Sequence, residues 1–69
     1  MDAKKLGKRI RLARVEADLT QTQLAERIRA KQKSISRYEA GKSIPQVATL
    51  MKLAKALKKP LAHFVAESD

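Results

Sequence analysis

Residues 21–42, QTQLAERIRAKQKSISRYEAGK, constrain the fold most, because they read as two short helices joined by a tight turn. Apolar residues recur at helical spacing in the first half, and Ile35 and Tyr38 do so in the second. At about 100° per residue, these two share one side of the second helix. Its other side carries amide, hydroxyl and basic groups: Gln32, Lys33, Ser36 and Arg37. A helix with such a free face can enter a DNA major groove, where Arg and Lys pair with guanine and Gln with adenine.

The charge of the chain also favours a polyanionic partner. Its 69 residues include sixteen Lys and Arg against seven Asp and Glu, which gives a formal charge of +9 at pH 7. A basic surface that only keeps the protein in solution would have the same composition. The position of the charges favours nucleic acid, because six basic residues lie within segment 27–42, where Glu39 is the only acid.

Length and composition exclude several other classes. The chain has the size of one domain with a small core, and it has no Cys and one His, so we expect neither disulfides nor a metal site. The few acids are scattered and no glycine-rich phosphate loop is present, so we predict no catalytic residues, no cofactor and no small-molecule substrate. No apolar run reaches the ~20 residues of a membrane span, and the N-terminus lacks the apolar core of a signal peptide. We therefore expect a cytoplasmic protein that is not an enzyme and does not bind membranes.

The apolar pattern predicts an all-α fold, a compact bundle of five short helices in a single domain over residues 1–69. The first helix is expected from residue 4 or 5 to 17, with Leu6, Ile10, Ala13 and Ala17 as its buried stripe. Residues 1–4 before it should form a loose arm, and residues 67–69 should fray. The helix-turn-helix is expected at about residues 21–40, with Thr20 and Gln23 as a capping box and Gly41 as the stop.

The C-terminal third predicts two further helices. Pro45 suits the first turn of a helix that continues to about residue 58, and Ser43 with Gln46 would form a second capping box. A last short helix should cover residues 61–66. The expected buried side of the longer helix contains Val47, Leu50, Met51, Leu53, Ala54 and Leu57.

Three motifs together, LTQTQLAERI, SISRYEAGKSIP and LMKLAKAL, resemble the helix-turn-helix family of phage repressors and Cro proteins, of the xenobiotic-response-element type. The resemblance covers about residues 6–65 and implies a lambda-repressor-like DNA-binding domain. The chain departs from the family at the turn, where Arg29-Ala30-Lys31 replaces a Gly-Val-Ser-like step. Either a non-Gly residue should therefore adopt the left-handed conformation after Ile28, or the turn should take another shape. Lys31 should leave the second helix without its usual side-chain cap.

The resemblance also implies roles for individual residues. Base reading falls to the outer face of the second helix, although each side chain alone could belong to a solvated face. Arg14 and Glu39 should form a mostly buried salt bridge, although Arg14 alone reads as an ordinary surface arginine. Leu61 and Phe64 should contact the partner in a dimer; the other role of this end of the chain is to close the core of the monomer, and Phe64 could do both. The expected phosphate ligands are Gln21, Lys31, Ser34, Lys42 and Ser43.

These expectations lead to two functional hypotheses. The first is sequence-specific binding of double-stranded DNA by a transcriptional repressor or regulator, as a dimer on a palindromic operator. Its homodimer should be weak in solution and stronger on DNA. The second is a protein-interaction module of the same fold, either an antitoxin or a coactivator domain.

Overall fold

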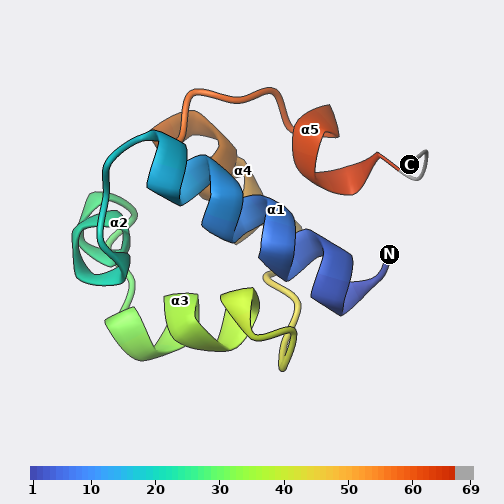
Figure 1. Ribbon diagram of the computed structural model, residues 1–69, viewed down its shortest axis with the longest axis horizontal. Coiled ribbons are helices and arrows are strands. Elements are labelled where there is room, and N and C mark those ends of the chain that lie inside the picture. Colours follow the sequence, from blue (N-terminus) through green and yellow to red (C-terminus); the bar gives the residue numbers. More distant parts are fainter. Residues whose placement is uncertain (67–69) are drawn as a thin grey trace.

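A computed structural model describes residues 1–66 and contains five helices in that range. They are α1 (Ala3–Glu16), α2 (Gln21–Arg27), α3 (Gln32–Glu39), α4 (Val47–Ala56) and α5 (Ala62–Val65). The described residues contain no strand, so the prediction of an all-α bundle is confirmed. Helix α1 crosses the centre, with α3 on one side of it and α4 and α5 towards the other (Figure 1). Residues 67–69, which were expected to fray, lie outside the described range.

The core is a single apolar cluster to which all five helices contribute. Its largest side chains with almost no exposed surface are Phe64, Leu6, Ile10, Leu24, Ile35 and Leu53. Burying a side chain of this size stabilises the fold by about 1.5–3 kcal/mol. No polar or charged residue in the described range is fully buried. Packing of helices therefore supplies most of the stability, as expected for a chain without disulfides.

Gly7 sets the distance between α1 and α3. A Cβ atom at this position would overlap the backbone carbonyl oxygen of Tyr38 and would lie 2.9 Å from that of Glu39. Both obstacles are backbone atoms at the end of α3, so they cannot turn aside as a flexible side chain would. The two helices approach this closely only because position 7 has no side chain.

The first four helices end in the same backbone arrangement, the Schellman motif. In each, the residue after the C-cap adopts a left-handed conformation: Asp18 (φ 58°), Arg29 (φ 56°), Gly41 (φ 73°) and Lys58 (φ 57°). The next residue then donates its N–H to a carbonyl five residues earlier, as Ala30 does to Ala25 at 2.8 Å. Of the two conformations expected after Ile28, the left-handed non-Gly residue is the one that forms, and Gly41 ends α3 as expected.

The helix starts agree with the sequence at α2 and differ at α1. The Thr20–Gln23 capping box is present, with Gln23 N to Thr20 Oγ1 at 3.0 Å and Thr20 N to Gln23 Oε1 at 2.9 Å. Lys31 makes no side-chain cap at α3, as predicted. The expected loose arm over residues 1–4 is wrong, because the side chain of Asp2 caps α1 and the helix begins at Ala3.

Other predictions near α4 and α1 were wrong. Gln46, not Ser43, is the N-cap of α4, and Pro45 precedes the cap, so the second capping box does not form. Met51 and Val47 are exposed rather than buried. Met51 follows the buried Leu50 by one residue, which turns it about 100° away from the core side. Ala17 is also exposed, because α1 ends before it.

Candidate nucleic-acid interface

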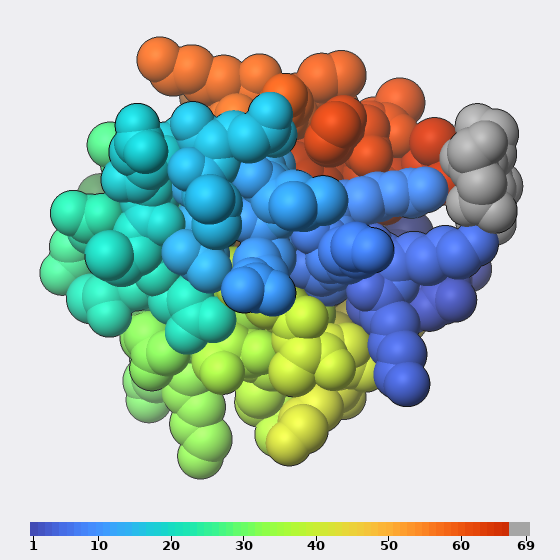
Figure 2. Space-filling model, in the orientation of Figure 1, coloured from blue at the N-terminus to red at the C-terminus, as the bar shows by residue number. Residues whose placement is uncertain are grey.

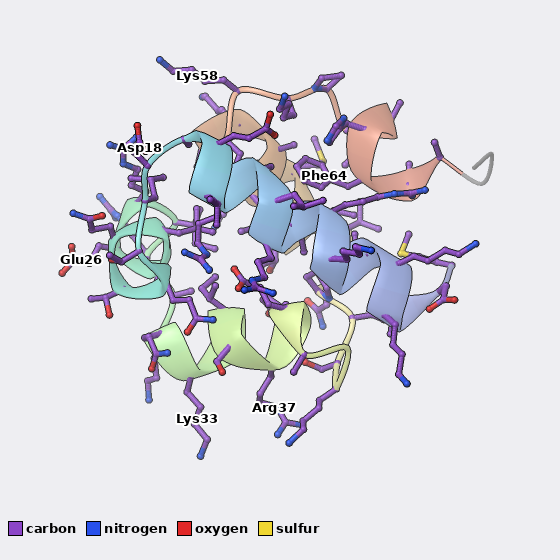
Figure 3. The ribbon with its side chains drawn as sticks, in the orientation of Figure 1. Asp18, Glu26, Lys33, Arg37, Lys58 and Phe64 are labelled. Carbon is purple, nitrogen blue, oxygen red and sulfur yellow. The ribbon has the colours of Figure 1, made fainter. Side chains whose placement is uncertain are left out.

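Helix α3 presents a polar, basic face to the outside. Lys33 and Arg37 point away from the body of the molecule, as the labelled side chains in Figure 3 show. Gln32 is exposed beside them, and Ser36 is half-buried on the same helix. The four predicted base-reading residues therefore lie on one short helix. Ile35, which is fully buried, and Tyr38, which is half-buried, attach its inner side to the core.

An ion pair anchors the carboxyl end of α3 to α1. Arg14 Nε donates to Glu39 Oε2 at 2.6 Å, and Arg14 Nη2 donates to Glu39 Oε1 at 3.0 Å. The side chains are 13% and 5% exposed, respectively. A third donor of Arg14, Nη1, binds the carbonyl oxygen of Leu19 at 2.8 Å. The hydrogen bond to Glu39 raises the pKa of Arg14 further above its usual value, so the guanidinium remains charged.

The same carboxylate begins a chain of hydrogen bonds that reaches the candidate reading face. Gln21 Nε2 donates to Glu39 Oε1 at 3.1 Å, and Gln32 Nε2 donates to Gln21 Oε1 at 2.6 Å. Gln21, predicted only as a phosphate ligand, is therefore also an internal link between the first helix of the motif and the second. Sequence reasoning missed this link, because it depends on how α2 and α3 pack against each other.

The remaining candidate phosphate ligands border α3 at both ends. Lys31 is exposed just before the helix and Ser34 is half-buried in its first turn. Beyond α3, Lys42 is exposed and Ser43 is half-buried in the following loop. This loop lies close to α1 because position 41 has no side chain; a Cβ there would lie 2.9 Å from Lys4 Cγ. In Figure 2, α3 and this loop form one continuous lower surface of the molecule.

The predicted dimer residues do not form an exposed pair. Phe64 has no exposed surface and belongs to the core of the monomer, so its assignment as a dimer contact is wrong. Leu61 is half-buried against the same cluster. Helix α5 is fastened to α1 by Arg9, whose Nη1 donates to the carbonyl oxygens of Phe64 at 3.3 Å and Ala66 at 2.7 Å. No pattern in the sequence indicated this role of Arg9.

Two other kinds of site are absent from residues 1–66. None of the helices in this range is long and apolar enough to cross a membrane. Across residues 1–66, no group of three or more His, Cys, Asp and Glu side chains is placed to hold a metal ion.

Two known proteins are similar to this chain over most of its length. Multiprotein-bridging factor 1b of Arabidopsis thaliana is 50% identical over 52 residues, which are 75% of this chain and 37% of that protein. The cryptic phage CTXphi transcriptional repressor RstR of Vibrio cholerae is 38% identical over 61 residues, 88% of this chain and 55% of the repressor. The chain thus spans about a third of the first relative and about half of the second.

A solved structure shares both the fold and part of the sequence. Bacillus thuringiensis PlcR, in a crystal structure with the peptide PapR7 and DNA, superposes with a TM-score of 0.85 at 41% identity. The match covers 91% of this chain and 22% of PlcR. Residues 10–64 match the helix-turn-helix family HTH_3 as a whole, a range that contains both helices of the motif and the residues that anchor them. The chain belongs to this helix-turn-helix family.

Proposed function

We propose that the chain is a sequence-specific, double-stranded-DNA-binding regulator of transcription, acting as a repressor that places α3 in the major groove. The outward face of α3 carries the proposal, because its Gln, Lys and Arg side chains are exposed while its inner side is anchored to α1. The family match and the similarity to the repressor RstR support it. Such a protein would act in the compartment that holds the DNA, which is the cytoplasm of a cell without a nucleus.

The hydrogen-bond chain suggests how Gln32 reads a base. Its Nε2 already donates one hydrogen bond to Gln21, which fixes the rotamer of the side chain. The amide oxygen and the second N–H of Gln32 remain for the N6 and N7 atoms of an adenine. Because the amide is held in place before binding, less side-chain entropy is lost on the DNA.

The long cations of α3 have a different role from Gln32. Lys33 and Arg37 point outward and make no side-chain hydrogen bond or ion pair within residues 1–66, and guanine O6 and N7 are their natural acceptors. Ser36 would make a shorter contact from the same helix. Phosphate contacts from Gln21, Lys31, Ser34, Lys42 and Ser43 would set the register of α3 in the groove.

We propose a homodimer on DNA that uses an apolar surface other than Phe64. Val47 and Met51 lie one turn apart on α4, and Ile44 precedes them; the three residues are 69%, 56% and 48% exposed, respectively. They follow the Lys42 loop in the chain, so a second copy joined here would sit beside the proposed phosphate contacts. Three side chains make too small an interface for a tight dimer in solution. DNA would therefore supply most of the energy of dimerisation, as two half-sites bind two copies.

Selection of bound sequences from a random duplex pool tests the proposal. We expect a palindrome with half-sites about one helical turn apart, and an affinity that falls steeply with salt. A pool without enrichment, or an affinity that salt does not change, would refute DNA recognition. The variant Val47→Glu/Met51→Glu should still bind a half-site but lose the preference for the palindrome, and an unchanged preference would refute this dimer surface.

Two single variants separate base reading from phosphate binding on the selected sequence. Arg37→Ala should cost about 1–3 kcal/mol of binding free energy and relax the preference at particular base pairs. Lys42→Ala should weaken the binding of all sequences about equally. If Arg37→Ala leaves the ranking of sequences unchanged, Arg37 does not read bases.

A second candidate function is favoured by the similarity to multiprotein-bridging factor 1b. In this alternative the same fold serves mainly as a protein-interaction module, as in a coactivator or an antitoxin. A chain that enriches no duplex sequence but copurifies with one protein partner in a fixed ratio would support it.

A further inference from the structure

A concave surface lies between the carboxyl end of α2 and the second half of α4, and the proposed DNA contact does not use it. Its volume is about 600 Å³, and it is lined by Arg27, Ile28, Arg29, Lys52, Lys55 and Ala56. We call these six residues the α2–α4 pocket. Four of them are basic, and none is acidic. The pocket therefore gathers a quarter of the basic residues of the chain in one place.

The four cations of the pocket are available to a partner. All four are exposed, and within residues 1–66 none of them makes a hydrogen bond or an ion pair through its side chain. The helix dipoles stabilise the positive charges of Arg27 and Lys55, which lie in the last turns of α2 and α4. Lys52 lies a turn earlier, where this stabilisation is smaller. Like charges collected around one hollow repel each other, so an anion placed among them relieves the repulsion.

The pocket differs in position from the DNA-reading face. In Figure 1, α4 lies behind α1 and α3 lies below it. Lys58, directly after the C-cap of α4, points in the opposite direction to Lys33 and Arg37 in Figure 3. None of the six pocket residues belongs to α3 or to the loop at Lys42. We therefore expect a duplex seated on the outer face of α3 to leave Lys52 and Lys55 uncovered.

We propose that the α2–α4 pocket binds an acidic segment of a protein partner. The hollow is open and its cationic side chains are exposed, whereas small-molecule sites bury most of their ligand between apolar walls. A peptide suits an open hollow, because its carboxylates can reach several cations at once. Its floor contains Ile28 and Ala56, and the stems of Lys and Arg side chains add apolar surface. One leucine or phenylalanine between the acidic residues of the segment would occupy this floor.

The test uses the full chain and a synthetic peptide of about twelve residues, rich in Glu and Asp and with a single central Leu. Binding is measured by fluorescence anisotropy, and the site is located from amide shifts in NMR spectra. The pocket variant is Lys52→Gln/Lys55→Gln. The matched control is Lys8→Gln/Arg11→Gln, which removes the same charge from exposed positions of α1.

We expect the pocket variant to bind the peptide about tenfold more weakly, because it loses two exposed ion pairs whose effects on the affinity multiply. The control should weaken peptide binding by less than about threefold, which is the effect expected from the change in overall charge. Amide shifts should be largest at Ile28, Arg29 and Ala56, and replacing the central Leu of the peptide by Ser should weaken binding further. Affinity for duplex DNA should fall equally little in both variants.

Four results would overturn the inference. They are no peptide binding to the unmodified chain, an equal loss of peptide affinity in both variants, amide shifts centred on α3, and a larger loss of duplex affinity in the pocket variant than in the control. The last result would assign the pocket to nucleic acid. The inference does not rest on the proposed function, because peptide binding is measured without DNA.

Discussion

Removing Glu39 should destabilise the protein far more than removing an ordinary surface acid. In Glu39→Ala the guanidinium of Arg14, whose side chain is 13% exposed, would retain only the carbonyl oxygen of Leu19 as a partner. Breaking a buried ion pair from one side costs about 3–5 kcal/mol, because the other charge is left desolvated and unpaired. A domain of 69 residues has a free energy of unfolding of roughly 3–10 kcal/mol. This one substitution should therefore remove about a third of the stability or more.

Urea unfolding of the unmodified chain, Arg14→Ala, Glu39→Ala and the double variant measures the coupling energy of the pair. We expect about 2–3 kcal/mol, the upper end of the range for residues in contact. The matched control is the exposed pair of Lys59 and Glu16, whose charged atoms are 3.8 Å apart and whose side chains are 32% and 63% exposed. Its coupling should stay below about 0.5 kcal/mol. If the two pairs couple equally weakly, the argument from burial is wrong.

Three further predictions concern the backbone and pH. Gly7→Ala should lower the free energy of unfolding by about 1–3 kcal/mol in urea titrations, because the new methyl group meets the backbone of α3; an ordinary helical Gly→Ala change would raise it. Arg29→Gly should raise the free energy of unfolding by roughly 0.5–1 kcal/mol, because relief of the left-handed strain exceeds the entropy cost of glycine. The charge-matched Arg27→Gly, within α2, should lower the free energy of unfolding. Hydrogen bonds from the N–H groups of Lys5 and Lys4 hold the pKa of Asp2 below its usual 3.8. The capping contribution of Asp2 should thus be complete above pH 3.8 and be lost as the pH falls through the lower, folded-state value, and an NMR titration midpoint above 3.8 would contradict this.

Features of the fold that depend on neighbouring residues could be predicted from the sequence. The Thr20–Gln23 box involves residues three apart, and the stop at Gly41 depends on one residue type, so both followed from local rules. For the residue after Ile28, the same rules left two possibilities, a left-handed residue or another turn shape, and the structure has the first. The Ser43–Gln46 box obeyed the same rule and was still wrong, because α4 begins one residue after Gln46.

Features that depend on packing could not be predicted in the same way. The apolar pattern of α4 included Val47 and Met51, but only the arrangement of neighbouring helices determines which apolar residues are covered. The link from Glu39 through Gln21 to Gln32 joins residues 18 and 11 positions apart in the chain. Such contacts depend on side-chain rotamers across α2 and α3, which a helical period does not specify. Phe64 could be recognised as apolar, but only the packed core distinguishes a buried contact from a dimer contact.

The close approach of α1 and α3 at Gly7 has a consequence for changing the specificity of this domain. Because position 7 and the Arg14–Glu39 pair fix α3 from its inner side, the position of the helix does not depend on Lys33 or Arg37. These two positions can therefore be randomised in a library without selecting again for folding. Gln32 is different, since an exchange there also breaks the hydrogen bond to Gln21. If α3 reads DNA as proposed, libraries that seek new target sequences should vary positions 32 and 21 together and positions 33 and 37 independently.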